Sequence, residues 1–351
     1  MTDFPFKPRV VGWELTLRCN MRCLHCGSIA GEPRPDELSV EEGFALIDQL
    51  VELGTEVVTL SGGEPMIHPA WDQYARRLVD AGVRTYMITN GLLLEQNIDR
   101  LLACGLRRLG ISIDGTEKTH NMIRNHPDSF RRAMAGARKA QEAGIQVGAV
   151  THISGANIGE MEPMYRLLEE AGFKFWQIQL AFAEGRMKEH DQYALRPEQI
   201  PEIVDFVHAC QQRDGLKVVA GDNLGYFEVP SIRDKPWKGC FAGRHVMGID
   251  ADGTVKGCLS LRREAFSEGN IRDEPLRQIW EDPQRFRFNR YFNPDMLTGH
   301  CTNCPHAIPC RAGCVVTAHG ATGNRFDNPY CAFRIQSGKG ACGWAGDHAA
   351  S

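Results

Sequence analysis

The sequence predicts an α/β fold, in which a parallel sheet covered by helices is followed by a smaller, cysteine-rich domain. Two observations support this prediction. From residue 10 to about residue 215, apolar segments of strand length alternate with amphipathic segments of helix length. After that point the periodicity fades, and glycine, proline and cysteine become frequent. Strands that alternate with helices pair in parallel, because each helix returns the chain to the same edge of the sheet.

Six strand–helix units are expected in the first part of the chain. The helix at residues 39–53 is typical, because Ser39 and Glu42 form a capping box at its start and Gly54 ends it. The expected strands are residues 10–17, 56–60, 84–89, 108–113, 146–153 and 175–182. The expected helices are residues 39–53, 70–81, 95–104, 129–143, 159–171 and 197–213. Six units are too few to close a barrel of eight strands, so we expect an open sheet.

The domain organisation follows from the same change in pattern. We expect an α/β domain at residues 1–215, a linker at 216–236, and a cysteine-rich domain with its tail at 237–351. At about 150 residues per domain, a chain of this length suggests two domains, or one large barrel with an appendage. No internal repeat or low-complexity tract is evident.

Composition narrows the class of protein. The formal net charge is −4, whereas a general nucleic-acid-binding protein is usually basic. The sequence has no apolar run of about 18 residues, as a transmembrane helix needs, and residues 1–9 lack the apolar core of a signal peptide. We therefore expect a cytoplasmic protein. In a reducing compartment its 13 cysteines indicate metal binding or catalysis rather than disulfides.

Three cysteines stand close together just after the first expected strand. Cys19, Cys23 and Cys26 have the spacing C-x3-C-x2-C. Four thiolates would saturate a cubane 4Fe–4S cluster, so three leave one iron open to a small molecule. A zinc site is the alternative, with His25 as a fourth ligand, but structural zinc is usually held by paired C-x2–4-C motifs.

The spacing resembles the defining motif of the radical S-adenosylmethionine (SAM) enzymes. In that family the open iron chelates the amino and carboxylate groups of SAM, and one electron cleaves SAM to methionine and a 5′-deoxyadenosyl radical. The resemblance implies a curved, open (β/α)6 partial TIM barrel. In such folds the chemistry takes place at the carboxyl ends of the strands.

Two further motifs at strand ends match this family. Ser61, Gly62, Gly63 and Glu64 follow the second expected strand and resemble the family motif that binds the SAM amino group. Asn90 follows the third strand in a Thr-Asn-Gly sequence, which many family members have beside the cofactor. The alternative for both motifs is a turn between a strand and a helix.

The resemblance implies five more residues near SAM. Ser112 and Asp114 are two apart in a strand and point to the same side, as in the family's ribose-binding motif, although they could instead cap a turn. Arg124 occurs in a His-x3-Arg sequence that lies near SAM in a subgroup of the family, and a solvated arginine is the alternative. His25 and Arg186 are weaker candidates for contacts at the adenine and carboxylate ends. His25 could equally be a packed core histidine.

Seven cysteines in the last part of the chain match the SPASM domain, a C-terminal extension of some radical SAM enzymes. The resemblance assigns an outer auxiliary cluster to the outer cysteine group, Cys301, Cys304, Cys310 and Cys331. It assigns an inner one to the inner cysteine group, Cys240, Cys258 and Cys314. The inner cluster has an open iron or a further ligand such as Cys342. Three 4Fe–4S clusters result, and the alternative is two zinc sites. Cys104 and Cys210 are expected to pack as apolar residues.

The principal functional hypothesis is a radical SAM enzyme that oxidatively modifies a peptide side chain, for example by crosslinking or dehydrogenation. The alternative is oxidative modification of a tetrapyrrole or another small metabolite, such as decarboxylation of propionates. A non-enzymatic zinc protein is a third hypothesis. The candidate cations for a carboxylate substrate are Arg107, Arg108, Arg262, Arg263 and Arg311.

Partners and the substrate cavity follow from the same resemblance. An electron donor such as flavodoxin or ferredoxin is expected. A separate partner would bind a leader peptide, because the first motif begins at Cys19 and leaves no room for a recognition domain. Leu259 follows Cys258, where sulfatase maturases have a catalytic aspartate, which argues against formylglycine formation. Glu14, Gln177 and Gln179 are expected to line the cavity.

Overall fold

The structure is a computed structural model that describes residues 4–224, 239–261 and 263–336. It contains one ten-stranded sheet with the order β10-β9-β8-β1-β2-β3-β4-β5-β6-β7. Strands β1 to β7 and β8 pair in parallel, and β9 and β10 are antiparallel to their neighbours. The strands are β1 (Val10–Glu14), β2 (Val57–Ser61), β3 (Arg84–Thr89), β4 (Arg108–Ser112), β5 (Gln146–Ile153), β6 (Phe175–Leu180), β7 (Lys217–Ala220), β8 (Val246–Ile249), β9 (Thr254–Lys256) and β10 (Gly269–Asn270).

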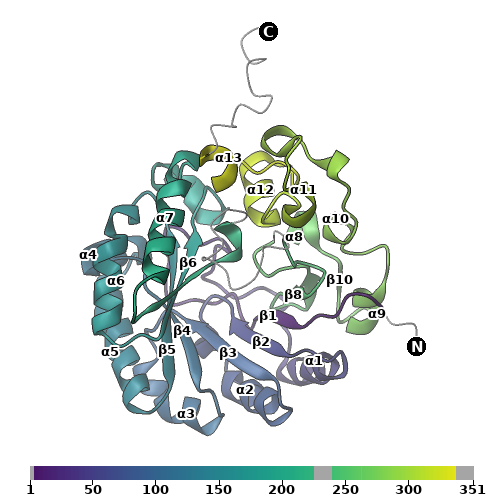
Figure 1. Ribbon diagram of the computed structural model, residues 1–351. Coiled ribbons are helices and arrows are strands. Elements are labelled where there is room, and N and C mark those ends of the chain that lie inside the picture. Colours follow the sequence, from purple (N-terminus) through teal and green to yellow (C-terminus); the bar gives the residue numbers. More distant parts are fainter. Residues whose placement is uncertain (1–3, 225–238, 262, 337–351) are drawn as a thin grey trace.

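Helices cover the outside of the curved parallel sheet, and the last helices lie together at one end of the molecule (Figure 1). The first seven are α1 (Val40–Glu52), α2 (Trp71–Asp80), α3 (Ile98–Ala103), α4 (Glu117–Arg124), α5 (Ser129–Glu142), α6 (Met161–Glu170) and α7 (Ile200–Gln211). The others are α8 (Arg263–Phe266), α9 (Leu276–Glu281), α10 (Arg287–Arg290), α11 (Ala307–Cys310), α12 (Val315–Thr322) and α13 (Ala332–Gln336). None of the helices in the described residues is long and apolar enough to span a membrane.

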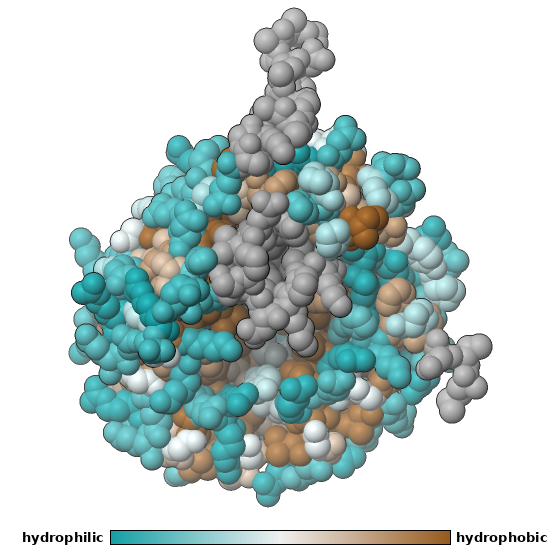
Figure 2. Space-filling model, viewed as in Figure 1, coloured by the Kyte–Doolittle hydropathy of each residue, from teal (hydrophilic) through white to brown (hydrophobic). Residues whose placement is uncertain are grey.

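The alternation of side chains along each strand separates two faces of the sheet. Trp13 of β1 points outward and packs on Tyr74 of α2, with ring centroids 5.0 Å apart. Its neighbour Gly12 points inward, where a Cβ atom would meet the side chain of Leu259 at 3.3 Å. The outward face forms the main core beneath the helices, while the inward face is enclosed by the curve of the sheet. Figure 2 shows the molecule from the same side, with hydrophilic residues over most of its outer surface and hydrophobic residues gathered mainly below and beside the centre of the view.

All six predicted strands and helices are present, with ends shifted by a few residues. The capping box of Ser39 and Glu42 at the start of α1 is confirmed. The prediction of a linker at 216–236 is wrong for residues 217–220, because these form β7 and pair with β6. Only Val218 and Ala220 of this short strand are buried, so its apolar pattern is too brief to recognise. Residues 225–238 of the predicted linker lie outside the described residues.

The cysteine-rich part is not separated from the sheet. Its strand β8 pairs with β1, with Val10 opposite Val246 and Trp13 opposite Ile249. The open partial barrel therefore extends on both sides of the six predicted strands. This arrangement places the turn after Cys258 against the inner face of β1, because Leu259 covers Gly12.

Candidate functional site

Ten cysteines form three groups in space. Within each group the thiols interact electrostatically with one another. The groups are Cys19, Cys23 and Cys26; Cys240, Cys258 and Cys314; and Cys301, Cys304, Cys310 and Cys331. Burial, together with the nearby Glu64 and the neighbouring thiols, raises the pKa of Cys19 to about 11. Burial likewise raises the pKa of Cys301 to about 12. Buried thiols gathered in this way favour a bound metal group, which supplies the positive charge that thiolates need.

The spacing of these thiols distinguishes between a zinc ion and a larger group. Among the described residues, the set of three side chains whose ligand atoms all lie within 4.8 Å of one another is His25, Asp114 and His152. No cysteine triplet in the described chain meets that limit. A zinc ion with Zn–S bonds of about 2.3 Å holds its sulfur ligands roughly 4 Å apart. The thiols of each cysteine group are therefore spaced more widely than the sulfur ligands of a single zinc ion.

Backbone contacts hold the loop that carries the first cysteine group. The amide of Cys19 donates to Gly31 O at 3.0 Å, and the amide of Leu24 donates to Ile123 O at 2.8 Å. Arg186 donates from Nη1 to Cys23 O and from Nη2 to Ala30 O, both at 2.7 Å. The sequence suggested that Arg186 contacts the cofactor, but the structure places its guanidinium on the backbone of this loop.

Gly62 and Gly63 pack closely against the backbone of residues 16–18, which directly precede Cys19. A Cβ atom on Gly62, which has φ = 143°, would lie 2.4 Å from Thr16 O. A Cβ on Gly63 would lie 2.4 Å from Arg18 O. The amide of Gly63 donates to Thr16 O at 2.8 Å. These contacts require glycine and bring the end of β2 directly beside the first cysteine group.

Glu64 joins this motif to the Thr-Asn-Gly turn. Its carboxylate is fully buried and accepts hydrogen bonds from Thr89 Oγ1 at 2.8 Å and from the amide of Asn90 at 2.8 Å. Burial raises the pKa of Glu64 to about 7, although these hydrogen bonds oppose the rise. Asn90 in turn donates from Nδ2 to Asn20 Oδ1 at 2.7 Å. The two predicted motifs therefore form one unit around the loop.

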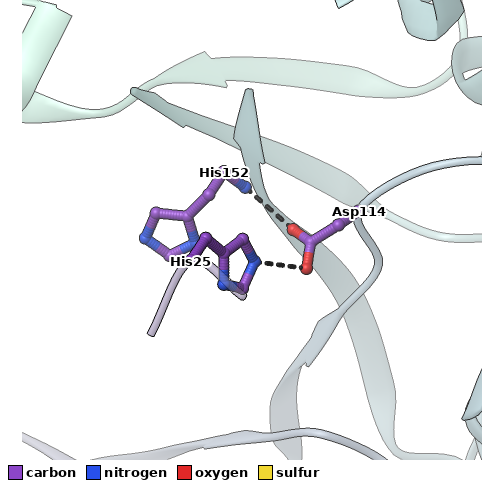
Figure 3. Close-up of side chains that lie close together, drawn as sticks. All are labelled: His25, Asp114 and His152. Atoms are coloured by element: carbon purple, nitrogen blue, oxygen red, sulfur yellow. Dashed lines mark hydrogen bonds and ion pairs between the residues drawn. The ribbon is translucent and has the colours of Figure 1, made fainter. Parts of the chain in front are cut away.

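Asp114 lies at the centre of a buried network at the ends of β4 and β5 (Figure 3). Its Oδ1 accepts from the amide of His152 at 3.0 Å, and its Oδ2 is 2.8 Å from His25 Nε2. Arg124 Nη2 lies 2.5 Å from the same Oδ2, and Arg124 Nη1 lies 3.8 Å from Cys23 Sγ. Burial acts to raise the pKa of Asp114, but Arg124 and His25 hold it well below its usual range. Asp114 thus links the loop of the first cysteine group to α4. Ser112, the other residue of the predicted ribose motif, is half-buried at the end of β4.

His152 is a site residue that the sequence analysis did not identify. Its ring lies 5.3 Å from the ring of His25, and it hydrogen-bonds the side chain of Gln179. Burial lowers the pKa of His152 to about 4, so the ring is neutral at neutral pH. A polar residue at the carboxyl end of a barrel strand is the signal that could have identified it.

The close spacing of His25, Asp114 and His152 does not make them a metal site. The guanidinium of Arg124 contacts the same Asp114 oxygen that a cation would use. A metal ion there would be repelled by this charge. The arrangement favours an organic ligand that uses hydrogen bonds.

Glu14 lies at the end of β1 on the same face as Gly12, which is the inward face of the sheet. It is buried and pairs with Arg34 Nε at 2.7 Å, and it accepts from the amide of Ala251 at 3.2 Å. Arg34 lies 3.7 Å from Asp250, and Asp250 lies 2.7 Å from Lys256 Nζ. These four charged side chains form an ionic chain between β1 and the β8–β9 turn.

Other predicted residues are also placed by the structure. Arg108 is the first residue of β4 and donates from Nε to Gln146 Oε1. It lies at the amino ends of the strands, whereas the motifs lie at their carboxyl ends, so it cannot contact a substrate bound at the motifs. Arg107 donates to main-chain carbonyls. Arg262, the side chain of Arg263, and Cys342 lie outside the described residues. Cys104 and Cys210 are buried in the core, as expected.

Comparisons with known proteins agree with the geometry. The radical SAM superfamily matches residues 13–168, and the SPASM family, an iron-sulfur cluster-binding domain, matches residues 240–305. The AdoMet-dependent heme synthase of Methanosarcina barkeri is 32% identical over 93% of this chain and 97% of its own. The mycofactocin maturase MftC of Mycobacterium tuberculosis is 28% identical over 92% of this chain and 82% of its own.

A solved structure shares the fold. SuiB of Streptococcus suis, bound to S-adenosylmethionine, superimposes with a TM-score of 0.73 at 16% identity. The match covers 93% of this chain and 76% of SuiB. The arrangement of the barrel and the cysteine-rich part is therefore one that a known structure also has.

Proposed function

Because this chain belongs to the radical SAM superfamily and carries a C-terminal SPASM domain, we propose that it oxidatively decarboxylates propionate side chains of a tetrapyrrole. The observation that carries this proposal is the similarity to the Methanosarcina barkeri AdoMet-dependent heme synthase along almost all of both chains. The chain is a radical SAM enzyme that binds SAM and iron–sulfur clusters. Three 4Fe–4S clusters, one in each cysteine group, are part of the proposal.

The chemistry of this reaction class is a net two-electron oxidation of the substrate. When bound, SAM and a reduced cluster supply a 5′-deoxyadenosyl radical that removes a hydrogen atom from an unactivated carbon. The propionate then loses carbon dioxide and one electron, and a vinyl group remains. The protein must orient the side chain, exclude water and accept that electron.

The residues around the first cysteine group are suited to hold SAM. The backbone at Ser61 to Glu64 lies beside the loop, and the buried carboxylate of Glu64 suits the SAM amino group. Asp114, His25 and Arg124 form a network just after β4. The family resemblance implies that the ribose and adenine of SAM bind at this place. The charges of this network are already paired with one another in the absence of SAM.

We infer that a large, partly apolar substrate would lie between the barrel and the inner cysteine group. Leu259 follows Cys258 and packs on Gly12 of β1, so an apolar side chain stands where a catalytic carboxylate would otherwise lie. His152 and Gln179 offer neutral hydrogen-bonding groups side by side on the neighbouring strands β5 and β6. The apolar and neutral character of these side chains supports a planar macrocycle with largely apolar faces.

Peptide modification is the second candidate. The mycofactocin maturase relative supports it, since it aligns with most of this chain. Under that hypothesis a separate partner would bind the leader segment of the peptide. In either case an electron donor such as flavodoxin or ferredoxin and a cytoplasmic location belong to the proposal.

The test is an anaerobic assay with SAM, dithionite and iron coproporphyrin III, whose four propionates provide the reacting groups. We expect 5′-deoxyadenosine to form together with a porphyrin that has lost the elements of formic acid from a side chain, as detected by mass spectrometry. A Cys19/Cys23/Cys26→Ala variant should form neither product and should hold about eight irons in place of about twelve. If SAM is cleaved while the porphyrin stays unchanged, the tetrapyrrole proposal is wrong and peptide substrates are tested next.

A further inference from the structure

In the sequence, Arg311 lies between cysteines of the two C-terminal groups. It directly follows Cys310 of the outer cysteine group and precedes Cys314 of the inner cysteine group. The chain turns at this point, because Arg311 has φ = 56° at the end of α11. The turn directs the side chain toward the segment before Cys240: a Cβ on Gly239 would lie 3.1 Å from Arg311 Cδ.

The guanidinium of Arg311 is held by the residue that also fixes Cys240. Arg311 Nη2 donates to Asn289 O at 2.6 Å. The side chain of Asn289 donates from Nδ2 to Cys240 O and to Ala242 O, both at 2.8 Å. The guanidinium also stacks over Phe292, with 5.0 Å from Cζ to the ring centroid. Its position relative to the inner cysteine group is therefore set by several contacts.

The charge of Arg311 lacks a carboxylate partner within the part of the chain that the structure describes. No aspartate or glutamate there forms an ion pair with it. The charged groups that act on it are Arg244, which repels it, and the thiol of Cys240, which attracts it. A half-buried cation without a counter-ion is costly, and an anionic cluster bound by Cys240 would remove that cost.

We propose that Arg311 raises the reduction potential of the iron–sulfur cluster held by Cys240, Cys258 and Cys314. A cluster gains one negative charge when it is reduced, and a fixed positive charge nearby stabilises that state. In the proposed reaction the substrate carbon loses one electron and this cluster gains it, so Arg311 favours the oxidation of the substrate. The inference rests on the proposed auxiliary clusters, but not on the identity of the substrate.

The test measures the potential without substrate, because a carboxylate-binding role for Arg311 would not change it. The full-length chain with Cys19/Cys23/Cys26→Ala is used as the background, so that only auxiliary clusters contribute to a redox titration followed by EPR. We expect Arg311→Gln to move one of the two midpoints to a more negative value. At the original midpoint the ratio of reduced to oxidised cluster should fall about tenfold, which corresponds to ~59 mV for one electron.

Two further substitutions and one matched control complete the design. Arg311→Lys keeps the charge and should retain most of the potential, whereas Arg311→Met keeps the apolar stem but should behave as Arg311→Gln does. Arg325→Gln is the control, since Arg325 is a half-buried arginine of the same domain that stacks on Phe288 and Phe326. Its removal should leave both midpoints in place.

The outcomes separate this inference from the proposed function. If the uncharged variants hold the same iron as the background and neither midpoint moves, the inference is wrong. A higher KM for substrate with unchanged midpoints would instead assign Arg311 to binding a substrate carboxylate. If the background chain itself holds fewer than about eight irons, the proposed pair of auxiliary clusters fails, whatever Arg311 does.

Discussion

Asp114 is the residue at which the separate parts of the site meet. It lies just after β4, its oxygens contact the loop through His25 and α4 through Arg124, and it accepts the amide of His152 from β5. Arg124 extends this link to Cys23. A change at any of these positions should therefore affect both the first cysteine group and the proposed SAM site.

Glu64 gives a prediction about pH. Its pKa is raised to about 7 by burial, so it is partly protonated at neutral pH before SAM binds. The SAM ammonium group favours the carboxylate and lowers that pKa, so binding should release a proton. SAM affinity should consequently increase as the pH rises through about 7 and level off above it, because the bound state holds fewer protons.

The Glu64→Gln variant tests this expectation. It should bind SAM more weakly by about 1.5–3 kcal/mol, as for a lost hydrogen bond to a charged group, and without proton release. Calorimetry in two buffers of different ionisation enthalpy measures both quantities. The control is Glu56→Gln. Glu56 lies just before β2, whereas Glu64 lies shortly after it, and the Glu56 side chain is partly exposed. An unchanged proton release in Glu64→Gln would assign the pH effect to another group.

At the scale of elements, a distant segment supports the loop of the first cysteine group. The 3-10 helix Gly185–Tyr193 follows β6, and its first residues bind the backbone of the loop through Arg186. Gly185 has φ = 55°, and a Cβ there would lie 2.4 Å from Cys26 O. The loop therefore depends on close contact between two elements that are far apart in sequence.

The Gly185→Ala substitution should displace the loop and destabilise the cluster in the first cysteine group. We expect the purified variant to lose about four of about twelve irons, as one cubane holds, while both C-terminal cysteine groups keep theirs. Iron analysis and EPR measure this. Gly27→Ala, in the same loop but with no atom within 4 Å of the added Cβ, should retain all of its iron. Equal iron in the two variants would show that the close contact at Gly185 is not needed.

The sequence predicted elements well where a hydrophobic pattern was long enough to repeat. Strand β5, with eight residues, was predicted with its observed ends. Helix α4 was missed because it is short and most of its apolar character comes from Met122 and Ile123. Strand β7 was missed because only two of its four residues are buried. A short element is defined by its neighbours more than by its own composition.

At the scale of the whole molecule, the two parts of the chain are joined by one sheet and by a buried ionic chain. Strand β8 pairs with β1, and Glu14, Arg34, Asp250 and Lys256 connect the two strands' ends. Asp250 is fully buried, with Lys256 Nζ 2.7 Å from its Oδ1 and Arg34 Nη2 3.7 Å from its Oδ2. The positive charges of Lys256 and Arg34 thus compensate its burial.

Replacing Lys256 with methionine should leave a buried, poorly compensated carboxylate at Asp250. We expect the free energy of unfolding to fall by about 3–5 kcal/mol, as when one partner of a buried pair is removed. Anaerobic urea denaturation of the holoprotein measures this. Arg77→Met breaks an exposed pair with Asp48 and should cost about 1 kcal/mol or less. Similar losses in both variants would indicate that the ionic chain does not stabilise the junction.

The sequence by itself determined the class of fold and the order of six strand–helix units, because the hydrophobic period is a local property that repeats along the chain. Its resemblance to the radical SAM and SPASM families assigned the cysteines to three groups. Only the tertiary structure decided which side chains share a site. Glu14 pairs with Arg34, Arg186 binds the loop backbone, and His152 joins Asp114. These outcomes depend on which strands are neighbours and on which face each residue lies, and such contacts between distant segments leave no pattern in the sequence.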